Sequence, residues 1–229
     1  MLYGFSEVIL KGAVVTLELA ITSVLLAVII GLVGAGAKLS RSKPLALVFE
    51  LYTTLIRGIP DLVLILLIFY GGQDLVNRIA MALGSTDYID INPFVAGVCT
   101  MGFIFGAYLS ETFRGAFMAI PKGQAEAGAA YGMSGMQVFF RILVPQMIRL
   151  AIPGFTNNWL VLIKATALVS LISLHDMTYM AKQASAATRE PFIFLMFAAA
   201  LYLVFTSISL SVLKRINARY SLGTEKVQL

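Results

Sequence analysis

Five stretches of apolar residues, each about the length of a membrane-crossing helix, dominate this sequence. They lie near residues 13–37, 45–71, 93–113, 150–174 and 191–213 of a 229-residue chain. A bilayer core of about 30 Å is crossed by about 20 helical residues, and within it only helices and closed barrels satisfy their backbone hydrogen bonds. Because 59% of the residues are hydrophobic and 13% are charged, we predict an all-α polytopic membrane protein with five transmembrane helices. Residues 1–229 are expected to form a single membrane domain. Residues 72–92 are interpreted as an outer loop with a partial helix, and the connections other than 114–149 and 72–92 are expected to be short.

The distribution of the 17 Lys and Arg residues predicts the orientation, because positively charged loops stay in the cytoplasm. Two of them, Arg57 and Lys164, lie within spans. Four lie on the side of the N-terminus: Lys11, Arg78, Lys182 and Arg189. The other 11 lie in or beside the first and third loops and in the C-terminal tail: Lys38, Arg41, Lys43, Arg114, Lys122, Arg141, Arg149, Lys214, Arg215, Arg219 and Lys226. We therefore expect the N-terminus outside and the C-terminus inside. Since this topology explains the net charge of +5, the expected partner is the lipid bilayer and not a nucleic acid.

The sequence lacks the residue patterns of an enzyme or a metal site. It contains no G-x-x-x-x-G-K-[ST] phosphate loop, one histidine, His175, and one cysteine, Cys99, and it has neither a G-x-S-x-G elbow nor an H-E-x-x-H pair. We expect Cys99 to be a buried, inert thiol and His175 to be a boundary residue. No cofactor is expected on this chain, and any energy-supplying domain must belong to another polypeptide.

The stretch "PKGQAEAGAAYGMSGMQVFFRILVPQ", residues 121–146, predicts a compact helix-turn-helix between the third and fourth spans. Pro121 suits the first turn of a helix, and Gly132 suits a left-handed C-terminal cap. Ser134 and Gln137 have the spacing of a capping box, and Pro145 is expected to end the second helix. A rigid unit rich in small residues favours a docking element for another protein, and the alternative is a helix lying flat on the bilayer.

Several motifs resemble the membrane subunits of ATP-binding-cassette importers. "EAGAAYG" followed by "ILVP" is similar to their E-A-A-x-x-x-G…I-x-L-P loop, with Gly128 and Val144 as the two departures. "AYLSETFRGAFMAIPKGQ", "TTLIRGIPDLVLILLIFYG" and "LIKATALVSLISL" narrow the resemblance to the permeases for polar amino acids. The resemblance implies that the elbow, about residues 121–145, couples to an ATPase subunit through Gly123, Gln124, Glu126, Ala127, Gly128, Gly132, Ile142 and Pro145.

The same resemblance implies a function and a set of partners. The expected function is inward transport of basic amino acids (histidine, lysine, arginine and ornithine) across the bacterial inner membrane. The expected partners are a homologous second permease, two ATPase subunits that hold ATP and Mg²⁺, and a periplasmic binding protein. The N-terminus would then be periplasmic and the C-terminus cytoplasmic.

Ionisable residues inside the predicted spans each need an explanation, because a charge there costs about 2.5–3.5 kcal/mol. They are Glu18, Arg57, Asp61, Glu111 and Lys164. Gly58 and Pro60 predict a broken helix in the second span, and broken helices tend to line substrate paths. Arg57 and Asp61 then lie beside that path, with Asp61 facing a cationic substrate. The alternative is an internal Arg57–Asp61 pair.

The remaining candidates are residues of a gate or of contacts between helices. Glu111 is expected to pair with Arg114 at the cytoplasmic boundary, Asn157 and Asn158 to form interhelical hydrogen bonds, and Lys164 to make a structural contact near the gate. The G-x-x-x-G match "GFIFG" at 102–106 favours close helix packing.

Three other functions are weighed against the ATP-driven permease for basic amino acids. An ion-coupled secondary carrier would work alone, but five spans without a visible inverted repeat do not favour it. A membrane-embedded enzyme lacks a catalytic constellation. A permease of the same class for another polar amino acid, such as glutamine, differs only in substrate.

Overall fold

The computed structural model describes residues 4–220, which fold into helices and contain no β-strand. The α-helices are α1 (Ser6–Leu39), α2 (Lys43–Gly58), α3 (Asp61–Ala82), α4 (Pro93–Met118), α5 (Lys122–Ala130), α6 (Gly135–Val138), α7 (Val144–Val169), α8 (Met177–Thr188) and α9 (Pro191–Tyr220). A π-helical turn, η2 (Phe139–Leu143), joins α6 to α7, and a 3-10 turn, η3 (Ser170–Ile172), follows α7. Lys226, counted above with the tail, lies outside the described residues.

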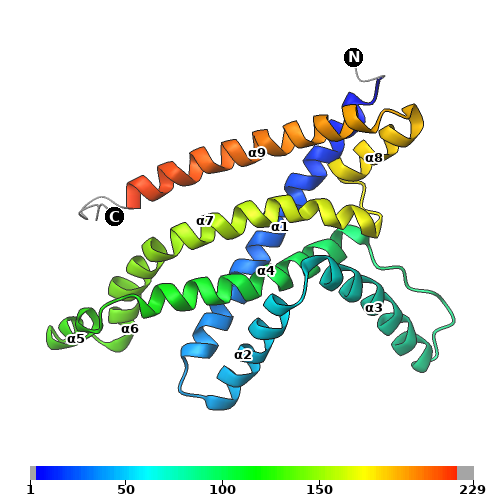
Figure 1. The fold of residues 1–229 in the computed structure, drawn as a ribbon. Helices are drawn as coiled ribbons and strands as arrows, with labels where there is room; N and C mark the ends of the chain where they lie inside the picture. Colours follow the sequence, from blue (N-terminus) through cyan, green and yellow to red (C-terminus); the bar gives the residue numbers. More distant parts are fainter. Residues whose placement is uncertain (1–3, 221–229) are drawn as a thin grey trace.

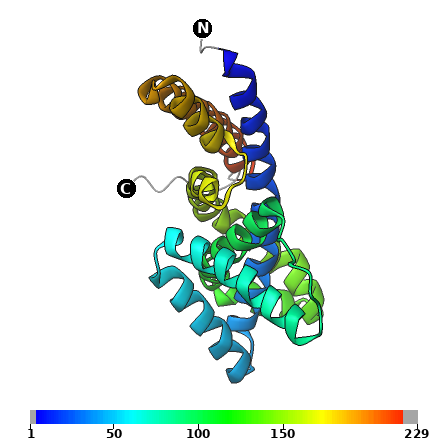
Figure 2. The same cartoon turned by 90° about the vertical axis from the view of Figure 1, so that its right-hand side faces the viewer.

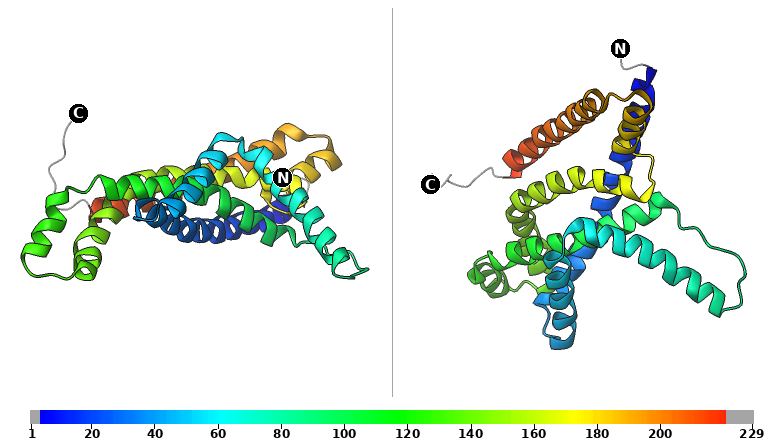
Figure 3. Two further views of the ribbon diagram at one scale, coloured as in Figure 1. Left: turned by 90° about the horizontal axis from the view of Figure 1, so that it is seen from below. Right: turned by 45° about the vertical axis from the view of Figure 1, so that its right-hand side comes forward.

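Five helical segments in residues 4–220 are long and apolar enough to cross a membrane, as predicted. They are Ser6–Leu39, Asp61–Ala82, Pro93–Met118, Gly135–Ile172 and Pro191–Tyr220. Helices α4 and α7 lie side by side, α1 crosses them, and α9 runs along the outside of α7 (Figure 1). The α5–α6 elbow lies at one end of α4, and the loop between α3 and α4 lies at the other, as the view from below also shows (Figure 3).

Helices α1 and α4 make the most extensive contact of the fold. A Cβ atom built on Gly102 would lie 2.5 Å from the Leu26 side chain, and one built on Gly106 would lie 2.6 Å from Ile30. The two helices therefore approach where α4 has no side chains, which is the packing that the "GFIFG" motif favoured. In the turned view of Figure 2, α1 runs from the N-terminal end of the molecule down to α4, with which it packs.

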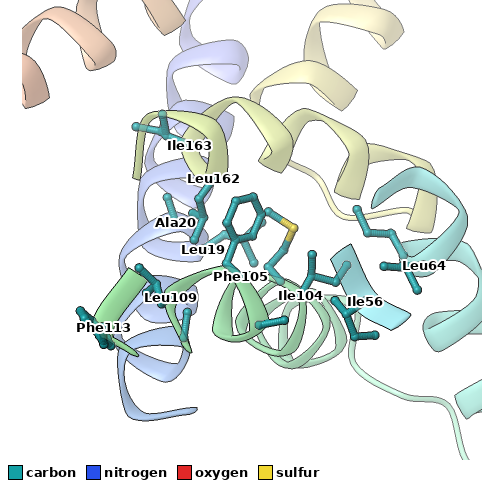
Figure 4. Close-up of a cluster of buried hydrophobic side chains, with 14 of the residues drawn as sticks. Leu19, Ala20, Ile56, Leu64, Ile104, Phe105, Leu109, Phe113, Leu162 and Ile163 are labelled. Atoms are coloured by element: carbon teal, nitrogen blue, oxygen red, sulfur yellow. The ribbon is translucent and has the colours of Figure 1, made fainter. Parts of the chain in front are cut away.

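The core gathers around α4. Phe105 lies at its centre, with Leu19 of α1 and Leu162 of α7 beside it, and all three side chains are almost fully buried (Figure 4). Ile56 of α2 and Leu64 of α3 pack against the same cluster. A displacement of α4 would therefore also displace α1, α2, α3 and α7, because close-packed interiors transmit strain.

The bounds predicted for the second span, 45–71, are wrong. Helix α2 ends at Gly58, Ile59 has an extended backbone, and α3 starts after Pro60, so the predicted break divides the span into two helices. Helix α3 then continues to Ala82 through residues that we expected in an outer loop with a partial helix. Gln73 and Asn77, whose polarity suggested that loop, lie one turn apart on the helix and are buried against the chain that follows it.

Two smaller expectations are also wrong. Cys99 is exposed and not buried, because its side of α4 is left uncovered by the other described helices. Residues 177–188, expected in a short connection, form α8. Asp176 starts this helix by accepting the Tyr179 N–H at 2.9 Å, and α8 then packs on α1 and α9. An aspartate at the N-cap was the available signal for this helix.

Candidate functional site

The elbow between α4 and α7 is a capped helix-turn-helix. Gly132 has a φ of +76° and donates its N–H to the Ala129 carbonyl at 2.9 Å, which closes α5. The Ser134 hydroxyl accepts the Gln137 N–H at 3.4 Å, and the Gln137 side chain accepts the Ser134 N–H at 2.9 Å. The left-handed cap and the capping box predicted from the sequence are therefore both present.

Helix α5 is held close to η2 and α7. Gly128 is buried, and a Cβ atom on it would lie 2.7 Å from Ile142, so the replacement of the usual Ala by Gly allows this approach. Gln146 of α7 donates to Gln124 of α5 at 3.3 Å. The outward side of the elbow is exposed and includes Gly123, Gln124, Glu126, Ala127 and Tyr131. This combination leaves a fixed and accessible surface beyond the end of the bundle.

Pro145 does not end the second helix of the elbow, contrary to our expectation. The turn before it is π-helical, and the Val144 N–H donates to the Phe139 carbonyl five residues back. Pro145 then occupies the first turn of α7, where a missing N–H costs least. As a result, α6, η2 and α7 form one uninterrupted helical run, and the elbow leads directly into a membrane span.

The broken helix brings Arg57 and Asp61 to the same tyrosine of α4. The Arg57 guanidinium carbon lies 5.7 Å from the centre of the Tyr108 ring, and the Asp61 carboxylate lies near the hydroxyl of the same tyrosine. Among residues 4–220 no ion pair joins Arg57 to Asp61. Arg57 and Asp61 are four residues apart, but because α2 ends at Gly58 they lie on different helices and not on one helical face. Gly58 and Pro60 are exposed at the break itself.

A cluster of charges joins α1, α2 and α4 near the elbow end of the bundle. The Lys38 side chain is only 5% exposed, and its ammonium group contacts Glu111, Glu50 at 2.6 Å and the Thr53 hydroxyl at 2.9 Å. Glu111 also binds Arg114 at 2.8 Å, so the predicted Glu111–Arg114 contact is part of a larger network. Three helices are thus held together by one buried lysine.

Helix α7 contacts α4 through small and polar residues. The Asn158 amide donates to the Thr112 hydroxyl at 2.9 Å, and a Cβ atom on Gly154 would lie 2.7 Å from the same threonine. Asn157 and Lys164 are exposed, and Lys164 forms no ion pair with any residue in 4–220. The roles predicted for Asn157 and Lys164 stay predictions.

Comparison with known families gives a match over most of the chain. Residues 23–220 match the inner membrane component of binding-protein-dependent transport systems. The chain belongs to this family. Such components are multi-pass proteins of the inner membrane, in agreement with the five apolar helices.

Two relatives are similar to this chain over all or most of their length. The histidine/lysine/arginine/ornithine transport system permease protein HisQ of Salmonella typhimurium is 58% identical over 229 residues and covers all of both chains. The arginine transporter permease ArtQ of Escherichia coli is 37% identical over 221 residues, covering 91% of this chain and 93% of the relative.

Solved structures of ABC transporters have a similar fold. An amino acid ABC transporter crystallised with histidines superposes with a TM-score of 0.80 at 31% identity, covering 94% of this chain and 95% of that one. The MetNI methionine transporter, with a TM-score of 0.77 at 17% identity, shows the fold alone. The overall fold of this chain is therefore that of a known amino acid ABC transporter chain.

Two residues of this permease were not singled out from the sequence. Lys38 was counted only as a loop charge, although it lies one helical turn after Gly34, where α1 approaches Ser110 of α4. Tyr108 was quoted within a motif but given no role, because a tyrosine in an apolar span looks like an ordinary packing residue. The contacts of both residues depend on the packing of α2 against α4, which the sequence alone does not reveal.

Proposed function

We propose that this chain is a permease subunit of an ATP-driven importer that carries basic amino acids (histidine, lysine, arginine and ornithine) into the cell. The observation that carries the proposal is the 58% identity to a permease of a histidine/lysine/arginine/ornithine system, with both chains covered completely. The arginine permease relative has the same class of substrate. ATP and Mg²⁺ would be held by the ATPase partners and not by this chain.

The proposed orientation puts the N-terminus in the periplasm and the elbow in the cytoplasm. The count of positive charges in the loops supports it. The elbow would dock on one of two ATPase subunits through Glu126, Ala127 and the exposed Tyr131. A second, homologous permease would complete the pathway, and a periplasmic binding protein would deliver the amino acid.

The connections of the elbow support a mechanical role. Met118, the last residue of α4, lies only four positions before α5, and η2 leads without a break into α7. Movement of the elbow would therefore displace α4 and α7 together. Tyr108 lies ten residues before the end of α4, about 15 Å along the helix axis at 1.5 Å per residue. Its contacts with Arg57 and Asp61 would carry that displacement to the broken helix.

The broken helix is the proposed substrate path. A carboxylate next to freed backbone carbonyls attracts an ammonium or guanidinium group and repels acidic amino acids. Asp61 is half-buried at the start of α3 and has no ion-pair partner within residues 4–220, so its charge is available to a cationic substrate. Glu111, Asn157, Asn158 and Lys164 would act in the contacts that accompany gating.

Reconstitution in proteoliposomes tests the proposal. The chain would be studied alone, with the second permease, and with the second permease plus the ATPase subunits, and uptake of labelled lysine, histidine and glutamine would be measured with the binding protein present. We expect uptake of lysine and histidine only in the full assembly with ATP. Uptake by the chain alone on an ion gradient would establish a secondary carrier, and a preference for glutamine would refute the proposed substrate.

A further inference from the structure

We infer that the loop of residues 83–92, between α3 and α4, is a docking surface for the soluble binding protein, and that it recognises a basic patch on that protein through Tyr88, Asp87 and Asp90. The inference rests on the proposed function, since it needs this end of the bundle to face the periplasm. The family description itself names dependence on a binding protein. The loop and the elbow lie at opposite ends of α4 (Figures 1 and 3).

Two buried amides of α3 fix the backbone of this loop. The Asn77 side chain donates to the Ile89 carbonyl at 2.9 Å and accepts the Ile89 N–H at 2.8 Å. The Gln73 side chain accepts the Ile91 N–H at 2.9 Å and also donates to the Ile89 carbonyl. Both amides are at most 9% exposed. Buried polar groups are costly unless they are satisfied, and here nearly all of their bonds go to the loop backbone.

Both ends of the loop are also defined. Gly84 has a φ of +90°, and the Ser85 N–H donates to the Ala80 carbonyl at 2.9 Å, which closes α3. Asn92 caps α4 by accepting the Phe94 N–H at 2.9 Å. A connection between two helices needs none of this order, because polarity and slack suffice. A loop whose shape is fixed in advance loses less entropy when it binds a partner.

The fixed loop presents an aromatic side chain and two carboxylates. Tyr88 is 67% exposed, and Asp87 and Asp90 on either side of it are exposed and form no ion pair within residues 4–220. The loop contains no Lys or Arg, although the chain carries a net charge of +5. Tyrosine is enriched at the energetic centres of protein interfaces, and complementary charge sets the rate and register of encounter. The matching surface is therefore basic, with room for one aromatic ring.

The same chemistry disfavours lipid as the occupant. Tyrosines in membrane proteins often lie at the bilayer surface, where nearby Lys and Arg contact phosphate groups. Here Tyr88 lies between Asp87 and the exposed Ile89, and the only charged groups of the loop are carboxylates, which repel anionic headgroups. The loop thus faces water and a soluble protein.

The test measures ATP hydrolysis by the complete complex in nanodiscs as a function of the concentration of its lysine-loaded binding protein. Tyr88→Ser should raise the concentration that gives half-maximal stimulation about tenfold, as loss of a central interface residue does. Asp87→Lys should raise it about three- to tenfold, and more at low salt. Asn77→Leu leaves the exposed side chains unchanged but releases the loop, and it should raise the same concentration at least threefold. In all three variants the hydrolysis rate without binding protein should equal that of the wild type.

Glu7→Lys is the matched control, since it makes the same charge change at an exposed position near the N-terminal end of α1. Its half-maximal concentration should stay within twofold of the wild type. An equal effect of Glu7→Lys and Asp87→Lys would mean that the binding protein responds only to the net charge at this end of the complex. That result would overturn the inference. It is also overturned if the loop variants keep wild-type half-maximal concentrations, or if Tyr88→Ser instead lowers the amount of complex in the membrane. Absence of any stimulation in the wild-type complex would refute the proposed function itself.

Discussion

Replacement of the buried Lys38 should destabilise the whole bundle. Lys38→Met keeps the length of the side chain and its apolar stem but removes the ammonium group that contacts Glu111, Glu50 and Thr53. Glu50 is 60% exposed and can turn to water, whereas Glu111 is only 18% exposed. The main cost is therefore a carboxylate left at a buried position with one cation in place of two.

The expected loss in the free energy of unfolding is about 3 kcal/mol. Removing one partner of a buried ion pair typically costs ~3–5 kcal/mol, and the lower end applies because Arg114 still contacts Glu111. For a chain of this size, 3 kcal/mol corresponds to a fall of about 6–12 °C in the midpoint of thermal unfolding. Scanning fluorimetry of the purified complex in detergent measures this shift.

Two further variants separate the network from general effects of charge. Lys43→Met removes an exposed lysine at the same end of the bundle and should change stability by less than about 0.5 kcal/mol. Lys38→Met combined with Glu111→Leu should recover most of the loss, because apolar replacement of a whole buried pair is often neutral. If Lys38→Met were no more destabilising than Lys43→Met, the contacts of the buried lysine would contribute nothing to stability.

Three other perturbations have defined outcomes. Glu126→Lys or Gly132→Asp should leave the protein in the membrane but uncouple it, by reversing a charge on the elbow or placing a Cβ at a φ of +76°; normal substrate-stimulated ATP hydrolysis and uptake in both variants would refute the docking role. Asp61→Asn should reduce uptake of lysine and arginine more than that of neutral histidine, measured in proteoliposomes with saturating binding protein, whereas equal losses would indicate a structural role. Burial raises the pKa of Asp176 from 3.8 to about 6. Between these two pH values the folded chain holds a proton that the unfolded chain has released. The free energy of unfolding should therefore fall by about 3 kcal/mol as pH rises from about 4 to 6. Asp176→Asn keeps the helix cap and should lack this fall, and a constant difference between variant and wild type from pH 4 to 7 would exclude the titration.

Local signals were sufficient for the number of spans and for the turn of the elbow. Apolar length identified the five spans, and Gly132 and Ser134 identified the turn, because caps and turns depend on one or two residues with restricted backbone geometry. The break at Pro60 was likewise local, since a proline removes a specific hydrogen bond. These features need no knowledge of which helices meet.

Contacts between distant segments were not predictable in the same way. Gln73 and Asn77 looked like loop residues because their partners, Ile89 and Ile91, are backbone groups that any sequence would supply. Pro145 looked like a helix end because a π-helical turn leaves no clear pattern in the residues that form it. Lys38 was interpreted as a surface charge because its carboxylate partners, Glu50 and Glu111, lie on two other helices.

The π-helical turn has a consequence for chain length. The elbow projects beyond the bundle like a loop, and loops usually tolerate insertions and deletions. The elbow cannot absorb such changes, because only three residues separate α4 from α5 and η2 continues as helix into α7. At 3.6 residues per turn, one residue added or removed within 139–143 would rotate the elbow by about 100° about the axis of α7. The elbow would keep its caps and its composition and yet present the wrong side outward, so the number of residues in this turn is as much a part of the coupling surface as their identity.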